Sequence, residues 1–146
     1  MPESLITSLI TRLKAEVSDL RTVEGAASLS VLVKNGSLPQ QTPAAWVIPV
    51  GMIGGQGQSA AGLYTQMMTE VLGVIVAFNT HSATAAGKMG ALDALIRAVI
   101  DAVAGWGPDE AVGVFEMRRG NLLSMNAGAV IYQIDFAIND QLRIAR

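Results

Sequence analysis

The fold is decided in the middle of the chain, at residues 63–105, which read LYTQMMTEVLGVIVAFNTHSATAAGKMGALDALIRAVIDAVAG. The part up to Phe78 alternates apolar with polar residues and predicts a long strand, with a bend near Gly73 because glycine weakens a strand. The part that starts at residues 80–84 repeats apolar residues at helical spacing and predicts an amphipathic helix that ends at Gly105. We therefore expect long strands packed against helices.

Two more helices are expected on the N-terminal side of this stretch. Apolar residues at helical spacing predict a first helix at about residues 3–17. Residues 23–34 are ambiguous, because LSVLV at 29–33 has the composition of a strand. The sequence Asn35-Gly36 that follows is a typical helix stop, and we predict a short helix.

Next come an expected strand and an expected loop. Residues 44–52 alternate in polarity and predict a strand, which Pro49 places at the edge of a sheet. Residues 53–62 contain four glycines, a composition that no regular element favours, and predict a mobile hairpin loop.

The C-terminal third predicts two strands, at 112–117 and 130–138, with turns at 118–121 and 124–128. The element order is therefore ααββαββ in one domain, residues 1–146. We expect an α+β fold with a mixed or antiparallel sheet of about four strands, flanked by two or three helices.

Composition indicates a surface that meets partners. The chain is 51% hydrophobic and 15% charged, whereas soluble domains average about 25% charged residues. No charged residue occurs between Asn35 and Thr69. Because a free monomer needs surface charge to stay soluble, this deficit predicts self-association.

Several classes of protein are disfavoured. The longest apolar runs, 44–53 and 71–78, are too short for the roughly 20 residues of a membrane helix, and the start of the chain has no signal-peptide core. Folding in the cytoplasm is therefore expected. A formal net charge of -2 gives no general attraction to nucleic acid, and the absence of cysteine rules out thiolate sites.

No motif in the sequence predicts catalysis, a cofactor or a metal. Residues 55–60 resemble a relaxed dinucleotide fingerprint, but a strand follows them where that motif requires a helix. His81 is the only histidine and, without a partner set, is interpreted as a junction residue held by local hydrogen bonds. Arg118 and Arg119 form a basic pair without interleaved aromatic residues, which favours a solvated or intersubunit role.

Three segments carry a resemblance to a known family. They are Leu38–Pro49, the helix at 90–105 that ends in Trp106, and Phe115–Leu123. Together they resemble the tail terminator proteins of long-tailed bacteriophages, over about residues 20 to 140. The resemblance rests on proline, aromatic and turn signatures of a fold and not on a catalytic constellation.

The resemblance implies a structural virion protein that is assembled in the host cytoplasm and resides in the tail and neck. Such proteins form a ring, usually of six subunits, which docks on the last ring of the tail tube. The ring stops polymerisation of the tube and offers a surface to the head-connector protein. DNA would pass through the ring without sequence-specific contacts.

A closed head-to-tail ring needs two different complementary surfaces on each subunit. We expect residues 53–62 to contact the tail tube, and Arg118 and Arg119 to face a neighbour or an acidic bore. The candidate interface residues are Trp46, Gly54, Gly55, Gln56, Gly57, Gln58, Ser59, Arg118 and Arg119.

Other functions remain open at this point. One is another neck or head-completion protein, which would also form rings of small mixed domains. Another is a small-ligand binding module with an apolar pocket between sheet and helix, for which the excess of Ala, Met and Val is weak support. An enzyme ranks last.

Overall fold

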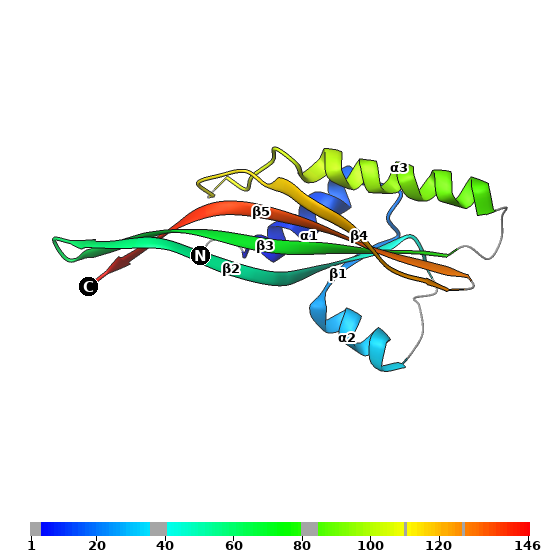
Figure 1. The fold of residues 1–146 in the computed structure, drawn as a ribbon, viewed down its shortest axis with the longest axis horizontal. Coiled ribbons are helices and arrows are strands. Elements are labelled where there is room, and N and C mark those ends of the chain that lie inside the picture. The colour runs from blue at the N-terminus through cyan, green and yellow to red at the C-terminus, as the bar shows by residue number, and fades with distance from the viewer. Residues whose placement is uncertain (1–3, 36–40, 80–84, 110, 127) are drawn as a thin grey trace.

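The computed structural model describes residues 4–35, 41–79, 85–109, 111–126 and 128–146. The described residues form eight elements around one five-stranded sheet, and the strands lie in the order β1-β2-β3-β5-β4 (Figure 1). The elements are α1 (Leu5–Glu16), β1 (Thr22–Gly25), α2 (Ala26–Asn35), β2 (Ala44–Ala60), β3 (Leu63–Asn79), α3 (Ala85–Val103), β4 (Glu116–Asn126) and β5 (Ala129–Ala145). This arrangement confirms the α+β class with three helices.

The sheet is mixed. β1 pairs in parallel with the first four residues of β2, and all other neighbours are antiparallel. β2, β3 and β5 are each 17 residues long, about three times the usual strand. Most of the sheet is therefore a long ribbon of three strands, flanked by the shorter β1 and β4.

The helices divide between the two faces of the sheet, with α1 and α3 on one face and α2 on the other (Figure 1). We call these the two-helix face and the one-helix face. The helix phase predicted from sequence is confirmed, since Leu9 and Leu13 of α1 and Val99 of α3 are fully buried. Alternate residues of the strands point to the same face and complete this core, among them Val74, Ile134 and Phe136.

A smaller core lies under α2. Trp46, Ala44, Ile75 and Ala77 are buried there, and Leu29 of α2 packs on them. The prediction of a helix at 23–34 is thus correct from Ala26 onward, whereas Thr22–Gly25 is a strand that the sequence reading missed. Four residues are too few for an alternating pattern to be recognised.

The prediction from Pro49 that β2 is an edge strand is correct for only part of β2. β1 covers β2 from Ala44 to Val47, so β2 is an inner strand there. From Ile48 onward, no other described strand pairs with the outer side of β2. Pro49 lies in this free edge, where its missing N–H leaves no ladder hydrogen bond unmade.

Two loop predictions are wrong. Residues 53–60 are not a loop, because β2 continues to Ala60 and a turn at Ala61-Gly62 connects it to β3. Residues 118–121 are not a turn, because β4 runs through them from Glu116 to Asn126. In both segments bulges interrupt the pairing, and a bulge breaks the polar alternation by which a strand is recognised.

The observed boundaries of the C-terminal strands also differ from the predicted ones. The predicted strand at 112–117 overlaps β4 only at its last two residues, and the strand predicted at 130–138 extends to Ala145. Asn126 closes β4, and β5 begins at Ala129 after Gly128, whose φ is 93°. Within the described part of the chain, no helix is both long and apolar enough to cross a membrane.

Candidate functional site

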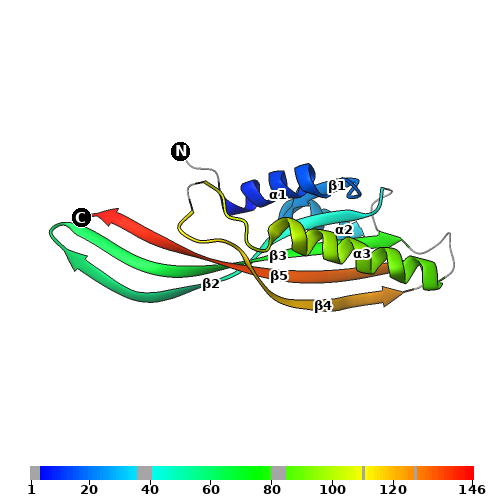
Figure 2. The same ribbon diagram turned by 90° about the horizontal axis from the view of Figure 1, so that it is seen from above.

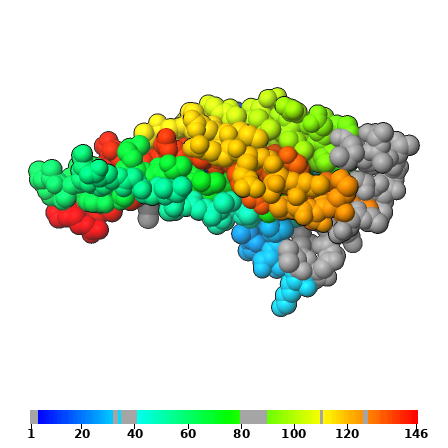
Figure 3. Space-filling view, in the orientation of Figure 1, coloured from blue at the N-terminus to red at the C-terminus, as the bar shows by residue number. Residues whose placement is uncertain are grey.

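The most prominent feature of the surface is an arm that projects from the helix-covered body. It consists of residues 49–71 of the β2–β3 hairpin and residues 139–145 of β5, which continue past the helices as a three-stranded ribbon (Figure 2). The space-filling view shows the same ribbon standing clear of the rest of the molecule (Figure 3). A sheet with both faces uncovered cannot be explained by the internal core of one chain, and it suggests a surface for partners.

The glycines of the arm have a structural reason. A Cβ atom on Gly57 would clash with the hydroxyl of Tyr64, and one on Gly54 would approach the side chain of Gln66 to 2.7 Å. The Tyr64 hydroxyl donates to Gln66 Oε1 at 2.7 Å, and Gln66 Nε2 donates to the carbonyl of Gly55 at 2.7 Å. Both side chains thus lie over the glycine backbone of β2, and Gln66, supported by Tyr64, links the two strands.

Both faces of the arm carry exposed apolar side chains, Met52 and Leu142 on the two-helix face among them, and the two faces differ mainly in charge. Because side chains alternate along β3 and β5 and their register is unbroken, the face of each arm residue is defined. The one-helix face carries exposed apolar side chains, which we call the arm patch. The arm patch consists of Val50, Ile53, Leu63 and Met67.

Hydrogen bonds hold the polar residues around the arm patch. Thr69 Oγ1 donates to Asn139 Oδ1 at 2.8 Å, and Arg143 Nε donates to Gln141 Oε1 at 2.7 Å. Arg143 is the only charged residue whose strand position places it on this face of the arm. The arm patch is therefore apolar and nearly uncharged.

The opposite face of the arm holds a pair of carboxylates. Partial burial of Glu70, with a smaller contribution from the nearby Asp140, raises the pKa of the Glu70 carboxyl above its ordinary value. Among the ion pairs of the described residues, none involves Glu70 or Asp140. The two-helix face of the arm therefore carries carboxylates, whereas the arm patch face carries none.

A second apolar surface lies on the edge strand β4. Three exposed side chains of β4 point to the two-helix face: Met117, Leu122 and Met125. We call these three residues the edge patch. Their register partners on β5 are Phe136, Tyr132 and Val130, in that order. Gly120 leaves room for the Tyr132 ring, since a Cβ there would approach the Tyr132 hydroxyl to 2.5 Å.

The polar residues of β4 point the other way. Arg119, Asn121 and Ser124 are register partners of Asp135, Gln133 and Ile131, which belong to the one-helix face. Arg118 occupies a bulge, and its guanidinium lies 3.5 Å from the Glu116 carboxylate in an exposed pair. β4 therefore separates its charged groups from its apolar groups.

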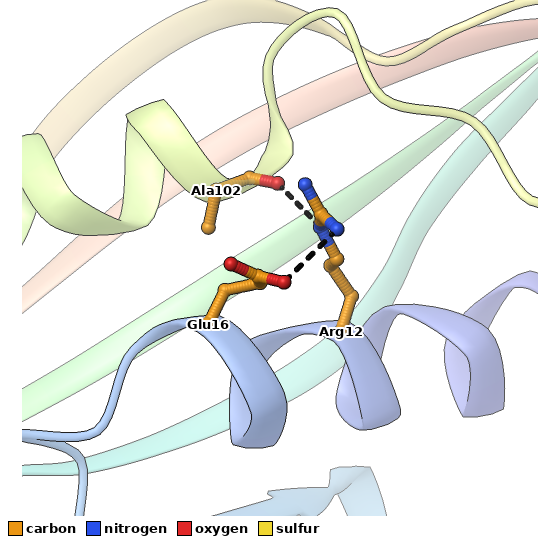
Figure 4. A network of polar contacts seen from close by, with 3 residues as sticks. All are labelled: Arg12, Glu16 and Ala102. Carbon is orange, nitrogen blue, oxygen red and sulfur yellow. Dashed lines mark hydrogen bonds and ion pairs between the residues drawn. The ribbon is translucent and has the colours of Figure 1, made fainter.

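A packed joint between α1 and α3 holds the body from which the arm and β4 extend. Arg12 of α1 donates from Nε to the carbonyl of Ala102 at 2.9 Å and lies 3.3 Å from Glu16 (Figure 4). Its guanidinium also stacks over the Trp106 ring at 5.1 Å. Trp106 in turn stacks on Phe115, with ring centroids 5.9 Å apart. The C-terminal end of α3 and the start of β4 are thereby tied to α1.

The residues that the sequence analysis proposed for an interface occupy three places. Gly54, Gly55, Gln56, Gly57, Gln58 and Ser59 all lie on β2 in the arm, and Arg118 and Arg119 lie on β4. Trp46 is 3% exposed beneath α2, so in the single chain its side chain belongs to the core. The arm and edge patches were not predicted, because their apolar residues resemble ordinary core residues in the sequence.

The other candidate sites can be placed only where they fall within the described residues. His81 lies outside the described residues. Across the described residues, no group of three or more His, Cys, Asp or Glu could hold a metal ion. A hollow of about 580 Å³ lies among Ser18, Asp19, Thr42 and Leu95. Its lining mixes charged and hydroxyl groups with apolar side chains of β3 and α3, Phe78 and Leu95 among them, so it is not a purely apolar pocket.

Comparison with known proteins gives an independent result. A family model described as phage tail terminator protein matches residues 5–146, which is nearly the whole chain. A search of curated proteins finds no match. The family match agrees with the resemblance carried by the proline, aromatic and turn segments, and the chain belongs to the phage tail terminator family.

Proposed function

We propose that copies of this chain form a closed ring, of six subunits, that caps the tail tube, stops its polymerisation and joins the tail to the head-connector protein. Family membership establishes the broader role: the chain is a structural component of a bacteriophage virion tail, and its family is not one of enzymes. The observation that carries the proposal is the projecting arm together with the apolar edge patch.

These features support a head-to-tail ring. A ring in which every subunit makes the same contact requires two different surfaces on one chain, one for each neighbour. The arm patch and the edge patch are two such surfaces, and each is apolar enough to gain from burial. The shortage of charge in the sequence has the same explanation.

The free edge of β2 supports a contact with the tail tube. Residues 54–59 have no strand partner on their outer side within the described structure, and they lie near the end of the arm, far from the helices (Figure 1). Because this segment contains no charged residue, a partner can bind to it without removing charged groups from water. Arg118 and Arg119 are proposed to face a neighbour or the bore.

The ring is tested by native mass spectrometry and negative-stain microscopy of the purified chain, alone and with polymerised tail tube. We expect closed six-membered rings on tube ends and tubes that stop growing when the chain is added. A chain that stays monomeric in both conditions, while the tube keeps growing, would contradict the proposal.

A genetic experiment tests the joining step. A phage that lacks the gene for this chain should yield filled heads without tails and tubes of uncontrolled length. Joined particles of normal tail length from that mutant would show that another protein caps the tube. Supplying the gene from a plasmid is the control.

A further inference from the structure

We propose that the arm of one copy lies across the edge patch of the next copy, so that the arm patch is buried on β4 of its neighbour. This contact rests on the proposed ring and assigns its two surfaces. The occupant of the arm patch is thus a second copy of this chain, and every subunit both gives an arm and receives one.

Exposure locates the two surfaces. Val50, Ile53 and Met67 are between two-fifths and two-thirds exposed, and so are Leu122 and Met125 at the other edge of the sheet. Exposed apolar side chains of this size are usual singly, but groups of them mark interaction sites. Burying the two groups against each other would remove both from water.

One chain cannot make this contact with itself. The arm patch is on the one-helix face and is built from β2 and β3, whereas the edge patch is on the two-helix face of β4. β5 separates β3 from β4 in the sheet. The two patches therefore point in opposite directions, and a single chain cannot bring its own two patches together.

The charges favour a second copy as the occupant. The only charge placed on the arm patch side is Arg143, and its guanidinium is already bound to Gln141. On β4 the charged and amide groups, Arg119 and Asn121 among them, lie on the face away from the edge patch. Docking the two patches therefore buries no carboxylate of the arm patch side or of the edge patch, and the Arg143 guanidinium keeps its hydrogen bond to Gln141. Burial of an unpaired charge would cost several kcal/mol.

An arm-to-edge contact can close with two kinds of symmetry. Two copies related by a two-fold axis can each lay the arm on the edge patch of the other, because a two-fold interface pairs surface i with surface j and j with i. The same contact repeated in one direction around a ring also covers both patches in every subunit. The projecting arm then acts as the link from each subunit to the next.

Two charge variants test the contact. Ile53→Glu places a carboxylate in the arm patch, and Leu122→Lys places an ammonium in the edge patch. Each variant alone should assemble at least about 30-fold less tightly than the wild type, because an unpaired charge is buried at every joint. Assembly is measured by native mass spectrometry across a range of concentrations, with and without tail tube.

Mixing the two variants gives the decisive measurement. In an equimolar mixture, an alternating ring places each Glu on a Lys and leaves the other joints as in the wild type. Rings should reappear with equal numbers of the two chains, and their formation should weaken with added salt. The absence of rings in the mixture would show that the arm patch and the edge patch do not meet.

The chain provides matched controls. Met52 is 65% exposed and Ile53 is 66% exposed, but the Met52 side chain lies on the opposite face of the arm. Met52→Glu, and Asn121→Lys on the far face of β4, should leave rings intact. If Ile53→Glu also leaves them intact, the arm contact is wrong although the ring stands; if wild type never forms rings, the ring is wrong as well.

Discussion

At the scale of single residues, the turn at the end of the arm contains a local strain. Ala60 pairs with Leu63, so Ala61 and Gly62 form a two-residue hairpin loop, and both have positive φ, at 54° and 80°. Two-residue loops of this kind favour Asn-Gly, because their twist matches that of the strands. Alanine in the left-handed region is disfavoured by roughly 1–2 kcal/mol.

Replacing Ala61 should therefore stabilise the chain. Ala61→Asn keeps the turn and relieves the strain, with an expected gain of about 1 kcal/mol and a rise in Tm of about 3 °C. Thermal unfolding followed by circular dichroism measures the change. Ala60→Asn, one residue earlier in the strand, serves as control and should give no gain; equal Tm values for both variants would argue against strain at the turn.

Glu70 predicts a dependence of stability on pH. Its pKa is raised in the folded chain by burial first and by Asp140 second, so the folded state binds the proton more tightly than the unfolded state. Stability from this site is therefore greatest below its ordinary pKa of 4.5 and is lost as pH rises through the raised folded value. The effect is small, since Glu70 is only partly buried and water screens the pair.

Glu70→Gln should remove this dependence. Relative to wild type, the variant should be more stable at pH 7, by no more than about 0.5 kcal/mol after screening, and should lose this advantage near pH 4. Urea unfolding at the two pH values measures the difference. An advantage that stays equal at both values would mean that the carboxylate is not its source. Glu24→Gln, on an exposed position of β1, is the control.

Single residues also explain why residues 53–62 of the arm were predicted to be a loop. Four glycines in ten residues indicate a loop when only local preference is considered. Here Gly54 and Gly57 are required by Gln66 and Tyr64 on the paired strand. That requirement depends on the register between β2 and β3, which the composition of either segment alone cannot reveal.

At the scale of elements, the helices were predicted well and the strand ends poorly. The period of apolar residues in α1 and α3 was sufficient, because each helix buries one continuous stripe. The arm strands bury little on either face, so their polarity does not alternate in the way that a half-buried strand would. The bulges in β4 shift the pattern again, and one of them falls between Leu122 and Ser124, at the consecutive residues Leu122 and Leu123.

Arg12 joins two of these helices, and its loss should be costly. Arg12→Ala removes the hydrogen bond to Ala102 and the contact with Trp106, for an expected loss of about 2 kcal/mol. Chemical denaturation measures it. Glu16→Ala, which removes only the exposed ion pair, should cost less than about 0.5 kcal/mol. Similar losses for both variants would contradict a joint based on Ala102 and Trp106.

At the scale of the whole molecule, the core and the arm are separable. The buried residues of the main core lie between the sheet and α1 and α3, and the smaller core lies under α2. Neither core includes a residue between Pro49 and Val71. The arm therefore contributes little to folding of the body, and its length is better explained by assembly than by stability.

A shortened arm tests this separation. In the variant, an Asn-Gly turn replaces residues 54–68, and the chain ends at Asn139, so that the existing pair Ile53 and Thr69 flanks a two-residue loop. Because no core side chain is removed, we expect cooperative unfolding with a Tm within about 5 °C of the wild type. The same protein should form no rings and should not stop the growth of tail tubes.

The two measurements together separate the possible explanations. A folded variant that still forms rings would show that the subunits meet through the body, and the arm would then have to serve the tube or the head connector. A variant that unfolds would show that the arm supports the core, contrary to the burial pattern. Folding without assembly is the outcome that the exposed ribbon predicts, since only a partner can cover a sheet that its own helices leave open.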